Sequence, residues 1–531
     1  MKTALLALTA LATSVYVAQR RSTPPSPPGG GAGGEGNGHG MRRSFIVATL
    51  IAMPVLSTAQ AAEERRSTAA DQTALAVTIY NGDLALVKDA RRIKLGGGEN
   101  LLAWRGVSAR MQPETALLRS LDGRKLTLLE QNFDFDLLTP QKLLEKSVGE
   151  AVRVIRAQPV TGVEYAEHAS VVAANDGVVL QFSDRVEAGN LGGPPGRIVF
   201  SRVPADLRDH PTLSMLFRSD APAATAYQGG TEHGLELSYL TGGLTWKADY
   251  VAELSAQEDS IDLNGWVTLT NTSGTAYLNA RLQLVAGEVN RAQTERPRAP
   301  VMMKALAMAD AAPQMQEESL FEYHLYTLDR NTTLGDKQTK QVALLSAQKV
   351  AVEKEFRLVG GDWYYHGQYG DLGRKLKPGV FMQFANKGEK GDGLGIPLPK
   401  GVVRVYKKDS SGRAQFIGED RIDHTAKGEM VKLKLGESFD ITADKKQTDF
   451  QKLAAGFNAR GGMIESGYQM EIRNAKREKV VVTVIENIPG EWQMLQESHP
   501  HKRESANSAI WEVAVPAEGK AVLNWRVRVK Y

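Results

Sequence analysis

The segment that decides the fold reads Leu244-Thr245-Trp246-Lys247-Ala248-Asp249-Tyr250-Val251-Ala252. Apolar side chains occupy every second position from Leu244 to Ala252, and the charged residues Lys247 and Asp249 stand between them. Because successive side chains of a strand point to opposite faces, this period of two predicts a strand with one buried and one polar face. The same alternation recurs over most of the chain after residue 70, and helical periodicity is scarce.

Turn residues and one helix pattern interrupt the alternating runs. Asn81-Gly82 separates the apolar positions of 75–79 from those of 84–86, which predicts a tight β-hairpin. The best helix candidate is Pro140 to Lys146, with Thr139 as the N-cap and Pro140 at the first helical position. We therefore expect an all-β fold with little helix, made of β-sandwich modules.

The spacing of strands and linkers indicates where the chain divides. Four or five short strands between residues 148 and 205 match the size of a small β-barrel, which we expect as an insert in a larger β domain. Residues 294–316 are rich in proline, alanine and methionine and have no usable period, as in a linker or mobile loop. The expected parts are an N-terminal extension (1–40), a signal peptide (41–61), an N-terminal β region (62–147), the small barrel (148–205), β-sandwich strands (206–293), the Met/Ala/Pro-rich loop (294–317) and a C-terminal β-sandwich region (318–531).

Residues 41–61 have the three parts of a secretory signal peptide. Arg42 and Arg43 form the charged region, residues 45–56 the apolar region, and Ala59-Gln60-Ala61 the cleavage site. Cleavage near Ala61 predicts a periplasmic or secreted protein, and the apolar run is too short to span a membrane. We expect the ordinary export route for unfolded chains, since the arginine pair lacks the preceding Ser or Thr of a twin-arginine signal.

A second apolar run, residues 4–18, and a Pro/Gly-rich stretch, residues 22–40, precede this signal peptide. One hypothesis is that translation begins at Met41 and that residues 1–40 come from an over-extended reading frame. The other hypothesis is an N-terminal anchor followed by a flexible spacer. We prefer the first, because a signal peptide placed behind another apolar run is unusual.

Charge and cysteine usage exclude several classes of protein. Residues 1–61 contain five basic residues and one acidic residue, and without them the basic and acidic residues are equal in number. The mature chain therefore has no net electrostatic attraction for nucleic acid. The chain has no cysteine, which excludes disulfides, thiolate zinc sites, iron–sulfur clusters and a cysteine nucleophile. We expect no cofactor and no integral membrane span in the mature chain.

The densest aromatic cluster is Asp362-Trp363-Tyr364-Tyr365-His366 with Tyr369 close behind it. Flat aromatic faces flanked by carboxylates and amides suit a sugar, so these residues form a candidate ligand surface for a glycan. The alternative is ordinary packing of aromatic side chains across neighbouring strands. The candidate ligand residues are Trp363, Tyr364, Tyr365 and Tyr369.

An acidic cluster, Glu419, Asp420, Asp423 and His424, is the candidate for metal or acid–base chemistry. On a strand, Asp420 and His424 would share a face but stand roughly 13 Å apart, too far for one ion without a bend. The alternative is a polar strand end in which Arg421 pairs with one of the acids.

No motif identifies a catalytic residue. The mature chain lacks the nucleophile elbow, the phosphate loop, the H-E-x-x-H zinc motif and the dinucleotide glycine pattern. The alternating C-terminus, Leu523 to Tyr531, is typical of the last strand of an outer-membrane barrel and equally of a sandwich strand. Thioethers of the Met/Ala/Pro-rich loop are possible Cu(I) ligands, but their spacing is irregular: Met302, Met303, Met308 and Met315.

A family resemblance rests on seven segments: Val77 to Lys88, Tyr239 to Tyr250, Leu263 to Asn290, Glu318 to Arg330, Ile396 to Tyr406, Gly418 to Thr425 and Lys446 to Phe450. Together these segments resemble the bacterial family that carries the domain of unknown function 4139. The resemblance implies an exported, β-rich protein without an established activity, and it transfers no catalytic residue. A related domain in mucoidy inhibitor A-like proteins implies envelope or surface-polysaccharide biology.

We therefore expect an exported cell-envelope protein that acts as an interaction or scaffolding module for a protein or a glycan. The first alternative is a carbohydrate-active or metal-dependent hydrolase of the periplasm, using the aromatic or the acidic cluster. The second is an outer-membrane β-barrel. A deep pocket that joins the two clusters would favour the enzyme, and separated positions would favour the interaction module.

Overall fold

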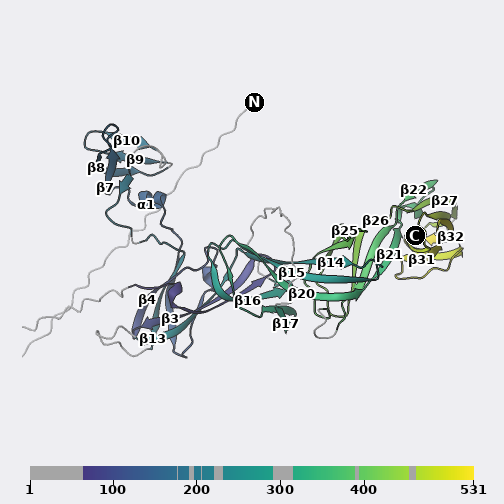
Figure 1. Cartoon of the computed structure of the whole chain (residues 1–531), viewed down its shortest axis with the longest axis horizontal. Coiled ribbons are helices and arrows are strands. Elements are labelled where there is room, and N and C mark those ends of the chain that lie inside the picture. The colour runs from purple at the N-terminus through teal and green to yellow at the C-terminus, as the bar shows by residue number, and fades with distance from the viewer. Residues whose placement is uncertain are drawn as a thin grey trace, which may run out of the picture. The chain divides into compact units, whose positions relative to one another are not determined.

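Strands dominate the computed structural model, which describes residues 64–175, 177–189, 197–204, 206–220, 231–290, 315–388, 394–453 and 462–531. Within these ranges the strands form six sheets, and one α-helix accompanies them (Figure 1). The all-β expectation is therefore confirmed. No helix in this part of the chain is long and apolar enough to cross a membrane. The predicted N-terminal extension, the predicted signal peptide and most of the predicted Met/Ala/Pro-rich loop lie outside the described residues.

Two sheets are built largely from the N-terminal part of the chain. The predicted hairpin is confirmed, because β2 (Gln72–Tyr80) pairs antiparallel with β3 (Leu84–Leu95). Its loop has three residues, and Gly82 and Asp83 both adopt positive φ angles, 88° and 58°. The larger sheet has the order β17 (Met315–Leu320), β18 (Tyr323–Leu328), β16 (Tyr277–Ala286), β2, β3, β13 (Thr231–Thr241) and β5 (Leu117–Ser120), with β19 (Thr332–Leu334) on β16. The smaller has the order β1 (Arg65–Ser67), β4 (Gly98–Arg105), β12 (Thr212–Ser219) and β6 (Leu126–Asp134).

The insert after residue 139 is an open sheet among the described residues, so the predicted small barrel is wrong there. Its two outer strands, β10 (Val186–Gly189) and β11 (Arg197–Val199), pair with different neighbours and not with each other. The predicted helix is confirmed as α1 (Pro140–Lys146). Leu144 of α1 packs into the apolar core of the insert, so the helix covers part of the sheet and the sheet does not have to close into a barrel. The inner strands are β9 (Val178–Gln181), β8 (Glu164–Ala173) and β7 (Ala151–Ala157).

The alternating segment from Leu244 to Ala252 lies in β14 (Leu244–Leu254), the middle strand of a five-stranded sheet. Its predicted apolar face is buried, but Asp249 on the opposite face is buried too. The carboxylate of Asp249 pairs with Lys247 at 3.0 Å and with Arg404 at 3.1 Å, so its charge is compensated. The order is β20 (Thr339–Ala351), β15 (Ser260–Asn271), β14, β24 (Gly401–Lys408) and β25 (Ala414–Ile422).

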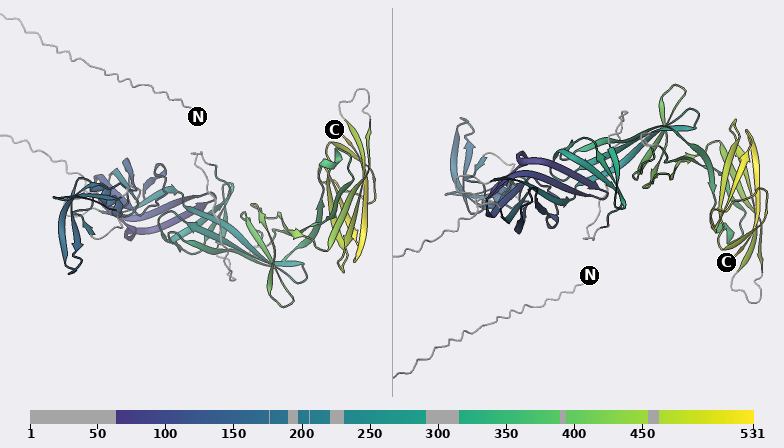
Figure 2. Two further views of the ribbon diagram at one scale, coloured as in Figure 1. Left: turned by 90° about the horizontal axis from the view of Figure 1, so that it is seen from above. Right: turned by 90° about the horizontal axis from the view of Figure 1, so that it is seen from below.

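The last two sheets, here called the C-terminal sheet pair, contribute side chains to one apolar core. Figure 2 shows their green and yellow strands gathered at the C-terminal end of the chain. The first sheet has the order β26 (Met430–Glu437), β23 (Gly379–Ala385), β21 (Glu353–Val359), β29 (Val480–Asn487) and β31 (Ser508–Val515). The second has the order β22 (Asp371–Leu376), β27 (Ile441–Leu453), β28 (Met463–Asn474), β32 (Gly519–Lys530) and β30 (Glu491–Glu497).

Candidate functional site

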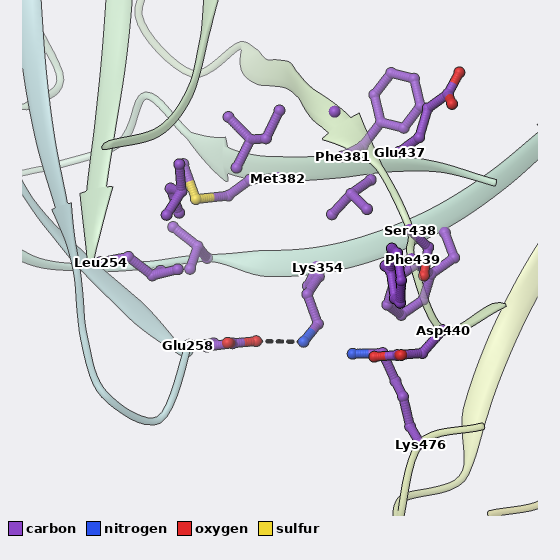
Figure 3. Close-up of a pocket in the computed structure, with 16 residues that line it drawn as sticks. Leu254, Glu258, Lys354, Phe381, Met382, Glu437, Ser438, Phe439, Asp440 and Lys476 are labelled. Carbon is purple, nitrogen blue, oxygen red and sulfur yellow. Dashed lines mark hydrogen bonds and ion pairs between the residues drawn. The ribbon is translucent and has the colours of Figure 1, made fainter. Parts of the chain in front are cut away.

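A hollow of about 290 Å³ lies near the end of β14 (Figure 3). We call it the apolar hollow, because apolar side chains form most of its wall. Its volume is at the lower limit for small-molecule sites, which suits one large side chain better than a whole cofactor. The wall residues used below are Leu254, Val352, Phe356, Met382, Ile417 and Leu435, and the rim residues are Glu258, Lys354, Glu437, Phe439, Asp440 and Lys476.

One side of the rim is fixed by a closed charge network. Glu258 lies in the tight turn between β14 and β15, where it binds the ammonium groups of Lys354 and Lys407. Partial burial of the Glu258 carboxyl group raises its pKa, but the hydrogen bonds from Lys354 and Lys407 outweigh this effect and hold the pKa at about 2. This side therefore stays charged but has its ionic partners already.

The opposite side of the rim is open. Phe439 lies in the turn between β26 and β27 and is 84% exposed, and the ammonium of Lys377 stands 5.5 Å from its ring centre. Glu437, Asp440 and Lys476 form no ion pair with any other described residue. Figure 3 shows Phe439 and Asp440 across the hollow from Leu254 and Met382. The hollow thus combines an apolar interior, an exposed aromatic side chain at its edge and charged rim residues without ionic partners among the described residues.

The lining gives no indication of catalysis. No histidine is among the described residues that line the hollow, and Ser438, its only hydroxyl residue, accepts the backbone N–H of Ile441 at 3.2 Å. Nucleophilic catalysis needs a base within hydrogen-bond reach of the nucleophile. The hollow can hold and orient an apolar group, and it presents no nucleophile–base pair.

The predicted aromatic cluster is divided between the surface and the core. Trp363, Tyr364 and Tyr365 form a single 3₁₀ turn, which points Tyr364 and Tyr365 into the core of the C-terminal sheet pair. Trp363 and Tyr369 are 51% and 40% exposed, and their rings meet edge to face at 4.9 Å. The surface that a ligand can reach is therefore limited to Trp363 and Tyr369.

The two buried tyrosines contact a buried ion pair, Lys445 and Glu486, that no sequence motif predicted. The Lys445 ammonium lies 2.6 Å from a Glu486 carboxylate oxygen, and both side chains are almost fully enclosed. Both residues stand at inward positions of alternating strands, β27 and β29. In each strand a charged residue occupies a position of the alternation whose preceding members are apolar. This pattern is the sequence signal that could have predicted a buried ion pair.

The predicted acidic cluster does not converge. Glu419 pairs with Arg404 at 3.1 Å, not with Arg421, and Asp420 accepts the backbone N–H of Lys434 at 2.7 Å. His424 accepts the backbone N–H of Lys400 at 3.3 Å, and burial, followed by the charge of Lys400, lowers the pKa of its imidazole. The fourth member, Asp423, joins no metal-binding group, and no set of three or more possible ligands occurs in the described ranges.

A second hollow, of about 490 Å³, lies over the N-terminal sheets. Asp89 and Arg91 are both among its lining residues. Asp89 accepts from Arg91, from the Trp104 indole at 2.9 Å and from Gln72 at 2.7 Å. These polar groups already satisfy one another, so they are not free to recognise a ligand.

The fold and the apolar hollow define an all-β protein of several sheets whose clearest site is a place for an apolar side chain. The sequence profile described as "Domain of unknown function (DUF4139)" matches residues 235–531, more than half of the chain. The chain belongs to this family, and the match contains every residue of the apolar hollow and all of the C-terminal sheet pair. No curated protein and no solved structure matches the chain.

Proposed function

We propose that this chain is an exported cell-envelope protein that binds another polypeptide, one of whose large apolar side chains enters the apolar hollow. The observation that carries the proposal is Phe439, a large aromatic side chain 84% exposed at the edge of an unfilled apolar space. Aromatic side chains around a concave apolar centre are the usual anchors of protein–protein contacts. The sheets on either side act in this proposal as sandwich modules that keep the hollow in shape.

The two unpaired carboxylates of the rim favour a basic residue in the partner, and the unpaired Lys476 favours an acidic one. Glu437 and Asp440 stand beside Phe439 without an ionic partner among the described residues, whereas the carboxylate of Glu258 is already paired. A lysine or arginine next to the apolar anchor would complement Glu437 and Asp440. The expected partner is thus a polypeptide segment with a large apolar residue next to a basic residue.

Export to the envelope rests on residues 41–61. Their charged region, apolar region and Ala59-Gln60-Ala61 cleavage site match a secretory signal peptide. Sequencing the N-terminus of the native protein tests this part, since a chain beginning at Ala62 is expected.

The binding role is tested by placing a photo-crosslinking benzoyl-phenylalanine at position 439 in living cells. Phe321, 86% exposed and outside the hollow lining, is the matched control position. We expect a protein adduct from position 439 and none from position 321, with the crosslink in the partner next to a Lys or Arg. Charge reversal by Glu437→Lys with Asp440→Lys should abolish the adduct. An adduct that survives this reversal, or equal adducts from both positions, would refute the proposal.

A glycan is the second candidate ligand, at a different place. The edge-to-face pair of Trp363 and Tyr369 leaves aromatic surface open to solvent, and Asp371 lies close by in sequence. A sugar ring that stacks there would quench the Trp363 fluorescence. Titration with envelope polysaccharide, with Trp363→Leu as control, distinguishes this role, because a response retained in Trp363→Leu excludes it.

A further inference from the structure

The ion pair of Lys445 and Glu486 joins the two sheets of the C-terminal sheet pair. Lys445 belongs to β27 in one sheet and Glu486 to β29 in the other, so the contact crosses the core. The distance from Nζ to Oε1 is 2.6 Å, and the two side chains are 4% and 0% exposed. This geometry holds an amine against a carboxyl group in a place that bulk water does not reach.

Aromatic side chains enclose the pair on several sides. The Lys445 ammonium stands 3.9 Å from the ring centre of Tyr364 and 5.2 Å from that of Trp525. At Gly360 a Cβ atom would come within 2.6 Å of both Glu486 carboxylate oxygens, so the backbone closes the remaining side. The site is thus tightly packed, and the amine and the carboxyl group have little freedom to separate.

Two phenol groups donate hydrogen bonds directly to the carboxylate of Glu486. Tyr364 and Tyr365 both donate to Oε2 of Glu486, Tyr365 at 3.0 Å. The hydroxyl of Tyr364 also contacts Nζ of Lys445, so it touches both members of the pair. One hydroxyl group therefore links the ammonium to the carboxylate.

Burial works against the charged forms of this pair. Desolvation lowers the pKa of the Lys445 ammonium, although the charge and hydrogen bond of Glu486 act in the opposite direction. Two charges taken out of water lose their hydration, which their mutual attraction only partly returns. An uncharged product that keeps the same atoms in place would remove this cost.

We infer that Lys445 and Glu486 condense to an intramolecular amide bond that ties the two sheets together covalently. Nζ passes one proton directly to Oε1, which lies 2.6 Å away, and the neutral amine then adds to Cδ of Glu486. The phenols of Tyr364 and Tyr365 donate to Oε2 and stabilise the negative charge that develops there, as donors do in an oxyanion hole. Nζ passes a second proton to Oε1, which leaves as water, so the Nζ–Cδ bond forms, the Cδ–Oε1 bond breaks and no redox partner is needed.

The packing holds the amine and the carboxyl group in contact, a condition that two free groups in solution lack. Groups held in contact react as if at very high concentration, with effective molarities of about 10⁵–10⁸ M. The chain has no cysteine, so a disulfide cannot join these sheets. The amide would give the domain the covalent cross-link that its composition otherwise excludes.

The test is mass spectrometry of the full purified chain after denaturation. We expect an intact mass lower by one water than the sequence from the measured N-terminus requires. Trypsin should release a branched peptide that joins residues 435–446 to 480–502, since acylated Lys445 is not cleaved. The Lys502–Glu512 pair, similarly close at 2.7 Å but exposed, is the internal control and should form no amide bond.

Variants separate the cross-link from simple packing. Lys445→Met should restore the full mass, whereas Lys502→Met should keep the deficit of one water. Tyr364→Phe should slow the appearance of the branched peptide, because it removes the hydroxyl that contacts both groups. The wild-type digest decides the matter even if Lys445→Met fails to fold. A full-mass wild-type chain that is cleaved after Lys445 would overturn the inference.

Discussion

Arg91 and Asp89 form a buried ion pair inside the N-terminal sheets, with 2.7 Å between Nη2 and Oδ2. Both residues have further hydrogen-bond partners: Arg91 also donates to the backbone oxygens of Ser67 and Arg105, and Trp104 donates to Asp89. The network joins β3 of the larger N-terminal sheet to β1 and β4 of the smaller one. It fixes how the first strands of the chain pack, so its loss has a predictable effect on stability.

Arg91→Met should lower the free energy of unfolding by about 3–5 kcal/mol, because it leaves Asp89 buried without a compensating charge. Urea unfolding followed by tryptophan fluorescence measures this loss. Lys502→Met, which breaks an exposed ion pair, is the control and should change stability by about 0–1 kcal/mol. Equal effects of the two substitutions would contradict the role of burial.

The pKa of Glu258 predicts a dependence of stability on pH. The bonds from Lys354 and Lys407 hold this pKa at about 2 in the folded state, below the usual value of 4.5. A lowered folded-state pKa contributes stability above the unfolded value, and this contribution is lost as the pH falls from 4.5 to about 2. Glu258→Gln should therefore be less stable than the wild type at neutral pH and should converge with it near pH 2.

Urea titrations of both proteins at several pH values check this convergence. A stability difference that stays constant down to pH 2 would mean that Glu258 acts through packing and not through its charge.

The N-cap of α1 gives a local prediction. Thr139 accepts the backbone N–H of Lys142 at 3.2 Å, and α1 has only seven residues, so the cap is a large part of its stability. Thr139→Ala should destabilise α1 by about 1 kcal/mol. Hydrogen exchange at residues 143–147 should become faster, while exchange in β28 stays unchanged. Unchanged exchange in α1 would show that Leu144 packing alone holds the helix.

Much of the fold could be predicted from the sequence, because alternation and turn residues are local properties of the chain. The hairpin at Asn81-Gly82 and the helix at Pro140 to Lys146 are examples. Alternation does not say what covers the second face of a strand, which is why Asp249 was expected at a surface and is buried. The open sheet of the insert was missed for a similar reason, since the helix that covers it is close in sequence but its docking is a tertiary effect.

The candidate site was harder to predict, because it depends on contacts between distant segments. Clustering in sequence placed Tyr364 beside Trp363, but a single 3₁₀ turn sends Tyr364 to the core and leaves Trp363 at the surface. The partners of Tyr364, Lys445 and Glu486, are 81 and 122 residues away. The apolar hollow likewise combines residues from Leu254 to Lys476 and has no local motif.

Gly360 offers the sharpest test of how tightly the buried pair is enclosed. A Cβ atom at Gly360 would meet the Tyr364 hydroxyl and both Glu486 oxygens, so Gly360→Ala must push this network apart. We expect a loss of about 1–3 kcal/mol in unfolding free energy, as for other overpacked cores. Gly370→Ala is the matched control, since its Cβ would meet nothing within 4 Å. Thermal unfolding of both variants, with the branched-peptide digest beside it, should show a lower Tm and less cross-link in Gly360→Ala alone; equal behaviour of the two variants would mean that the pair has room to move.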